Sequence, residues 1–288
     1  MRRSIPAPMD LLVAAAVLTA SLLHASWHAL VKSSGDQVTA LAGMNLVSGA
    51  VALALIPFAK PLPLTVFALI LGSVVLHAGY KLALARLYVY ADLGQAYPLA
   101  RGLTPIIATI LAYLFIGETP GPAIALGVAV VCLGLVLLAF ERGGRRLAPA
   151  ALAAAALVGF TVAAYSVLDA YGIRLVNDWF SFTVWLVSID SSAFVAYALA
   201  TRGTSALAAW RGNPVRVAAS GLFGVLSFGV FMWALGRAPV GAVSALRETS
   251  VIFAALIGTL FLHERADWRR FLAAATVMAG VGVIALAH

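Results

Sequence analysis

Apolar residues fill most of this chain in long runs that short polar breaks separate. A transmembrane helix needs about 20 predominantly apolar residues. The breaks carry Pro, Gly and charge, as in Ser33-Ser34-Gly35-Asp36 and Lys60-Pro61, which mark turns between helices. The pattern predicts an all-α polytopic membrane protein with ten transmembrane helices. They are residues 9–31, 38–59, 62–88, 93–116, 120–140, 148–171, 178–200, 214–236, 239–262 and 267–287.

The fourth and ninth runs are copies of one pattern. Residues 96–118 and 242–264 are identical at seven of 23 positions. The shared residues include one Arg early in each run, Arg101 or Arg247, and a Glu just past its end. An internal repeat in a polytopic membrane protein is typical of secondary transporters.

The strongest polar break, residues 141–147, divides the ten runs into five and five. Because five is odd, the second set of helices enters the membrane from the opposite side. The sequence therefore predicts two inverted five-helix repeats, residues 1–140 and 148–288, joined by a linker at 141–147.

The composition indicates that the membrane is the solvent of this chain. The chain is 63% hydrophobic and 10% charged, with a mean hydropathy of +1.01. A soluble domain is about 45–50% apolar and about 25% charged. The net charge of +8 predicts no nucleic-acid partner, because the Lys and Arg residues are spread over short loops, where they set topology.

The loop charges also predict an orientation. The loops after the odd-numbered runs carry eleven Lys and Arg residues, and the other side carries five. Positive loops stay in the cytoplasm. The linker is therefore expected in the cytoplasm and both termini outside, in a multi-pass protein of the inner (plasma) membrane.

Three stretches resemble a known family: Trp27 to Lys32, Thr104-Pro105 through Phe115-Ile116-Gly117-Glu118, and Ser250 through Phe261-Leu262-His263-Glu264. They resemble the EamA-type repeat of the drug/metabolite transporter superfamily, whose members have ten helices as two five-helix repeats. The resemblance covers almost the whole chain and is nearest to the aromatic amino-acid and metabolite exporters. It implies export of an amino acid or related metabolite by alternating access through a central cavity.

Several side chains are candidates for contact with the solute. Lys81 is the strongest, because His77 lies one turn before it on the same helix face and Tyr80 adjoins it. A cation beside an aromatic ring suits a substrate carboxylate, although Lys81 also fits a side chain that reaches for the headgroups. The remaining candidates offer rings for stacking or a hydroxyl donor, and they are Trp27, Tyr97, Tyr165 and Ser244.

The repeated arginines are candidates for a gate or for the cavity wall. Arg101 and Arg247 each lie about eight residues into a run, or about 12 Å deep at 1.5 Å per residue. Inversion predicts opposite depths for them, at the two mouths of the cavity. There they would line the mouths or pair with acids when one mouth closes; simple anchoring at the two interfaces is the alternative.

Two prolines bracket Arg101 in the fourth run. Pro98 and Pro105 each remove a helix hydrogen bond and predict a kink, and the freed carbonyls are candidates for cavity contacts. Val251 replaces the second proline in the ninth run. Residues 239–262 are therefore expected to form the straighter helix.

The acidic residues within the runs need partners or a cavity, because an intramembrane charge is expensive. Asp169 and Asp190 are candidates for proton coupling, and Glu248 belongs with the gating or cavity group. Glu118 and Glu264 are predicted as helix-end carboxylates that pair with Arg265 or Arg269.

The function classes other than transport are less well supported. A membrane-embedded enzyme acting on a lipid or peptide is the main alternative, but Asp267 occupies the second His position of H-E-x-x-H. An ion channel fits an inverted repeat less well. We expect no enzyme activity, cofactor or metal. The expected partners are a small-molecule solute and membrane lipid, with a monomer favoured over a homodimer built on small-residue pairs such as Ala123 and Gly127.

Overall fold

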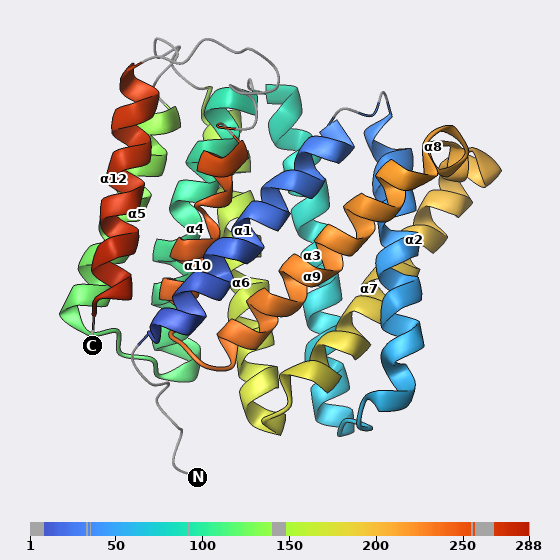
Figure 1. The fold of residues 1–288 in the computed structure, drawn as a ribbon, viewed down its shortest axis with the longest axis horizontal. Coiled ribbons are helices and arrows are strands. Elements are labelled where there is room, and N and C mark those ends of the chain that lie inside the picture. The colour runs from blue at the N-terminus through green and yellow to red at the C-terminus, as the bar shows by residue number, and fades with distance from the viewer. Residues whose placement is uncertain are drawn as a thin grey trace.

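The computed structural model describes residues 9–287 except 33, 35, 91–92, 140–147, 255 and 257–267, and it leaves a few further side chains, including that of Tyr97, undescribed. All regular elements within these ranges are helical (Figure 1). They are α1 (Leu11–Lys32), α2 (Gln37–Leu55), η1 (Ile56–Phe58), α3 (Leu64–Tyr90), α4 (Leu93–Ile116), α5 (Pro122–Ala139), α6 (Pro149–Val176), α7 (Trp179–Arg202), η2 (Gly203–Leu207), α8 (Ala208–Gly212), α9 (Pro214–Leu235), α10 (Val240–Arg247) and α12 (Trp268–Ala285).

Within the described residues, eight helices are long and apolar enough to cross a membrane. They are α1 to α7 and α9, and each matches a predicted run. Their outer faces carry large exposed apolar side chains, such as Val75, Leu114 and Phe115, which suit lipid rather than water. The protein is therefore a multi-pass membrane protein. The predicted count of ten is not confirmed, because the last two runs are only partly described and α12 has a shorter apolar stretch.

The polar breaks end and start the helices by ordinary capping. The Asp36 carboxylate accepts hydrogen bonds from the backbone N–H groups of Val38 and Thr39 at the start of α2. Asp178 does the same for Ser181 at the start of α7. These side chains replace the partners that the first turn of a helix lacks. Capping therefore explains why the loops fall where the sequence places them.

The helices pack in pairs that join the two halves of the chain, residues 9–139 and 148–287. The pairs are α5 with α12, α2 with α7, α1 with α9, α3 with α6, α4 with α6 and α4 with α10. The start of α1 and the end of α12 lie at the same end of the bundle (Figure 1). Each half is therefore held mainly by the other half.

The ninth predicted run is broken, and the prediction that it is straighter than α4 is wrong. Helix α10 ends at Arg247, and the helix resumes at Ser250. The backbone N–H groups of Thr249, Val251 and Ile252 donate to the third residue before them, which tightens the turn. The Leu246 carbonyl also accepts from the Thr249 and Ser21 hydroxyls, at 2.7 and 3.2 Å. By contrast, α4 continues through both of its prolines.

Helices α5 and α12 approach so closely that only glycine fits between them. A Cβ at Gly280 would lie 2.7 Å from the backbone nitrogen of Val131 and 2.8 Å from the Gly127 carbonyl oxygen. Small residues permit this approach between membrane helices. The small-residue pair that includes Gly127 thus serves packing within the chain.

We expect Gly280→Ala to lower the thermal stability of the purified protein. Overpacking against a backbone costs about 1–3 kcal/mol, more than alanine gains as a helix former. Gly282→Ala is the matched control, because a Cβ at Gly282 meets nothing within 4 Å. Thermal unfolding in detergent measures both variants. Equal melting temperatures for the two would contradict the close approach.

Candidate functional site

A buried ion pair joins the two halves in the middle of the bundle. The Arg101 Nε atom on α4 lies 2.6 Å from the Glu248 Oε2 atom. The two side chains are only 2% and 1% exposed. Glu248 directly follows α10, and its backbone N–H still donates to the Ser244 carbonyl. Each charge is thereby compensated in an environment where an unpaired charge is costly.

Arg247, the residue before Glu248, packs on an aromatic ring. Its guanidinium carbon lies 4.1 Å from the centroid of the Phe231 ring on α9, a cation–π contact. No ion pair involves Arg247 within the described ranges, and its Nη1 atom is buried without a hydrogen bond there. The guanidinium therefore retains donors for an anionic group.

Helix α1 contributes an aromatic and imidazole group beside these arginines. The Trp27 indole N–H donates to the His24 Nδ1 atom at 3.2 Å, and its ring stacks on His28 at 3.7 Å. Both histidines lie within electrostatic reach of Arg101 and Arg247. Trp27, a predicted solute contact, thus lies next to the arginines.

The structure brings the two repeated arginines close together. Arg101 pairs with Glu248, and Arg247 is the chain neighbour of Glu248. Arg101 thus pairs with an acid, one of its two predicted roles. The placement of the two arginines at opposite mouths of a cavity stays a prediction.

A second charged cluster joins α3 to α7. The Lys81 Nζ atom lies 3.4 Å from both carboxylate oxygens of Asp190, and it also faces the Phe194 ring at 4.5 Å. The His77 Nδ1 atom lies 3.6 Å from Asp190 Oδ1. Asp190 therefore has two basic neighbours, and Lys81 is ion-paired within the protein rather than extended to the headgroups.

Aromatic rings surround this cluster. The His77 ring lies 4.1 Å from the Tyr165 ring on α6 and 6.0 Å from the Phe228 ring on α9. The Tyr80 and Tyr165 rings are 6.5 Å apart. The structure brings together four of the predicted solute contacts, His77, Tyr80, Lys81 and Tyr165, and their contact with a solute stays a prediction.

Asp169 connects the two clusters. It lies on α6 one turn after Tyr165 and is 0% exposed. It interacts electrostatically with His77 and Asp190 in one cluster and with Arg247 in the other. We call the resulting set the polar layer. It consists of His24, His28, His77, Lys81, Arg101, Asp169, Asp190, Arg247 and Glu248.

Another ion pair, nearly buried, lies at the end of the bundle where α4 finishes. Arg174 on α6 donates to the Glu118 carboxylate and to the backbone carbonyls of Leu235 and Ala238. The other Glu118 oxygen accepts from the backbone N–H of Val240 at 2.9 Å. The predicted pairing of Glu118 with Arg265 or Arg269 is therefore wrong. Arg265 and Glu264 lie outside the described residues.

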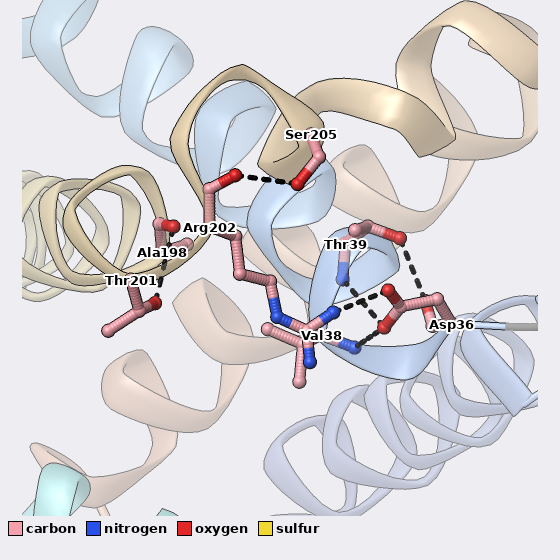
Figure 2. Close-up of polar contacts among 7 residues, drawn as sticks. All are labelled: Asp36, Val38, Thr39, Ala198, Thr201, Arg202 and Ser205. Carbon is pink, nitrogen blue, oxygen red and sulfur yellow. Dashed lines mark hydrogen bonds and ion pairs between the residues drawn. The ribbon is translucent and has the colours of Figure 1, made fainter.

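Two weaker ion pairs tie opposite ends of α2 and α7. Arg202, at the end of α7, binds the Asp36 carboxylate that caps α2, while Ser205 and Thr201 bond to nearby backbone (Figure 2). At the other end, the Lys60 Nζ atom lies 3.9 Å from the capping Asp178. Asp36 and Arg202 are 46% and 38% exposed, so solvent screens this pair.

A family of known proteins matches the second half of the chain. Residues 149–286 match the model of the EamA-like transporter family. The second half of this chain is EamA-like. The matched segment coincides with the predicted second repeat, 148–288, and it supports a membrane transporter rather than an enzyme.

The comparison with solved structures supports the fold. One solved structure, described only as "Crystal structure of protein", has a TM-score of 0.76 at 20% sequence identity and covers 95% of this chain and 98% of its own. At that identity the likeness shows a shared fold. No curated protein matches the chain, so the nearer resemblance to aromatic amino-acid exporters stays a proposal.

The remaining predicted site residues fall into different places. Ser244 on α10 is 2% exposed, and its hydroxyl has no hydrogen bond within the described ranges. Pro98 and Pro105 are buried inside α4. The side chain of Tyr97 lies outside the described residues. None of these positions tests the predicted roles.

Sequence reasoning missed several contacts of the polar layer. It named neither the Lys81–Asp190 pair nor the Arg174–Glu118 pair, and it omitted Phe231 altogether. The available signal was charge balance, because a buried cation in a membrane requires a nearby acid. That rule requires an acidic partner for each buried cation, but it does not identify which acid that partner is.

We expect Glu118→Gln to destabilise the protein strongly. The variant would leave Arg174 partly buried without a counter-charge, and breaking a buried pair costs about 3–5 kcal/mol. Asp36→Asn is the control, because asparagine caps a helix as well as aspartate while removing an exposed pair worth about 0–1 kcal/mol. Thermal unfolding in detergent compares them. A smaller loss for Glu118→Gln than for Asp36→Asn would show that the Glu118 contacts do not hold this end.

Proposed function

We propose that the protein is a secondary transporter that moves a small organic solute, an amino acid or related metabolite, in the export direction. It does so in the inner membrane by alternating access through a central site between two inverted repeats. The observation that carries the proposal is the polar layer, which residues of both halves form in the middle of apolar helices. Intramembrane charges mark substrate and ion pathways.

The helix packing supports the inverted repeat. In an inverted repeat, α1 corresponds to α6, α3 to α9 and α4 to α10. Exchanging corresponding helices turns the pair α1–α9 into α6–α3, and it turns the pair α1–α10 into α6–α4. Both members of each exchange are packed pairs. The pairs α2 with α7, α4 with α10 and α5 with α12 map onto themselves. A pseudo-twofold relation of this kind is the basis of alternating access in inverted-repeat transporters.

The end contacts of α2 and α7 support the same relation. Asp36 caps α2 and binds Arg202 at the end of α7. After 142 residues, Asp178 caps α7 and binds Lys60 at the end of α2. Lys60 and Arg202 are also 142 positions apart. At each end of the bundle, the acid that caps one of these two helices therefore pairs with a basic residue at the end of the other helix.

The chemistry of the polar layer favours a zwitterionic solute. Lys81 and Arg247 offer cations to a carboxylate, while Asp169, Asp190 and Glu248 offer anions to an ammonium group. Trp27, Tyr80 and Tyr165 offer ring faces beside these charges, which suit an apolar side chain. An amino acid presents all three features in one small molecule. The single chain supplies the complete layer, so we take the monomer as the transporting unit.

Counterflow in proteoliposomes tests the function. We expect labelled phenylalanine to exchange with the wild type, and Lys81→Ala to lower the initial rate at least about tenfold because the Lys81–Asp190 pair is lost. Lys60→Ala, which removes a lysine whose side chain is 81% exposed, is the control and should keep the wild-type rate. A wild-type rate for Lys81→Ala would remove Lys81 from the transport site.

Cysteine labelling tests the orientation. We place the linker at 141–147 in the cytoplasm and both termini outside, from the charge of the loops. A Cys132→Ser/Gly144→Cys variant should resist a membrane-impermeant thiol reagent in intact cells and react after lysis. Labelling in intact cells would instead place the linker outside the cell and both termini in the cytoplasm. Cys132 itself is buried, so its replacement serves only to remove background.

A further inference from the structure

Asp169 is the one carboxylate of the polar layer that is fully buried without an ion pair of its own within the described residues. Neither carboxylate oxygen has a hydrogen-bond partner of good geometry there. Ser73 and His77, one turn apart on α3, are the polar groups of α3 that act on it. Burial without a partner favours the protonated form of such a carboxylate.

The groups that face Asp169 come from three other helices. His77 lies on α3, Asp190 on α7 and Arg247 next to the turn after α10. His77 interacts with both acids: its Nδ1 atom is 3.6 Å from Asp190 Oδ1, and its charge also acts on Asp169. Asp190 in turn is paired with Lys81.

Resting on the proposed transport function, we propose that Asp169 is a proton-binding site that exchanges one proton for the amine group of the solute, with His77 as its proton acceptor. The O–H bond of the Asp169 carboxyl breaks, and His77 takes the proton to become an imidazolium. Loss of this proton to water then leaves a carboxylate on Asp169. The coupled solute is therefore one that carries an ammonium or amine group.

Charge balance across the four residues Lys81, Asp190, His77 and Asp169 explains why this step is accessible. With the proton on Asp169, the four carry one positive and one negative charge. With the proton on His77, they carry two of each. The net charge is zero in both states, so the transfer buries no additional net charge. Once the proton has left for water the net charge is minus one, and the ammonium group of an incoming solute restores neutrality.

Infrared spectroscopy tests the proton site without any solute. In a titration from pH 8 to pH 5 we expect the wild type in proteoliposomes to develop a carbonyl stretch of a protonated carboxyl group that shifts on transfer to D2O. This band should be absent from Asp169→Asn. It should persist in Asp10→Asn, the control, because Asp10 is an exposed acid at the start of α1. An unchanged band in Asp169→Asn would overturn the proposal.

A second measurement tests the coupling. An outward proton gradient is applied to the same proteoliposomes, with a pH-sensitive dye inside and labelled phenylalanine outside. The wild type should accumulate phenylalanine while protons leave. Asp169→Asn should lose both the accumulation and the proton efflux, whereas Asp10→Asn, whose acid is exposed and lies outside the polar layer, should keep both. Accumulation driven by the gradient in Asp169→Asn would contradict the proposal.

The outcomes separate this proposal from the proposed function. Absence of phenylalanine counterflow in the wild type would contradict the transport of this solute, while the infrared band would still decide whether Asp169 holds a proton. If Asp169→Asn does not fold, Asp169→Glu replaces it. That variant should show a shifted band and retain coupling, and an unshifted band would count against Asp169.

Discussion

The cost of an uncompensated charge in the membrane is the constraint on which the rest of this structure depends. A charged side chain at the centre of a helix costs at least about 2.5–3.5 kcal/mol on insertion scales, and this chain carries several. The structure meets the constraint by pairing. Arg101 meets Glu248, and Lys81 meets Asp190. Each pair takes one residue from each half, so the need for compensation also brings the halves together.

The position of Glu248 shows how the backbone adapts to this need. The turn after α10 interrupts a helix that apolar composition alone would continue, and side-chain hydroxyls of Thr249 and Ser21 satisfy the Leu246 carbonyl that the turn exposes. In lipid, such a break is tolerated only where protein groups complete its hydrogen bonds. The break therefore marks a place where ionic pairing takes precedence over helical regularity, as expected of a functional centre.

The charged contacts at the ends of the bundle differ from those in the middle. The Glu118–Arg174 pair is nearly buried and also binds backbone groups of three elements. The Asp36–Arg202 and Lys60–Asp178 pairs are more exposed and weaker. In the proposed transport cycle, the two ends of the bundle must open in turn. Meanwhile the charged residues of the central pairs bind the charged groups of the solute in place of one another. Among the described residues, a weak pair lies at each end of α2 and α7, and the nearly buried Glu118–Arg174 pair is added at one end. This arrangement suits a structure that is closed more firmly on one side.

The sequence predicts much of the fold because hydrophobic run length and capping residues are local signals. The spans up to α9 begin and end close to their predicted residues, and Asp36 and Asp178 cap the helices that follow the predicted breaks. The partners of the buried charges were not predictable. Whether Glu118 binds Arg174 or Arg269 depends on which helix ends meet, and that is set by packing of distant segments.

The most direct test of this account is the coupling energy between Arg101 and Glu248. Thermal unfolding of Arg101→Met, Glu248→Gln and the double variant in detergent gives a double-mutant cycle. Each single variant leaves one buried charge unpaired, and the account predicts a loss of about 3–5 kcal/mol for each. The double variant should recover most of that loss. Losses that simply add would contradict the claim that compensation of buried charge between the halves holds this structure together.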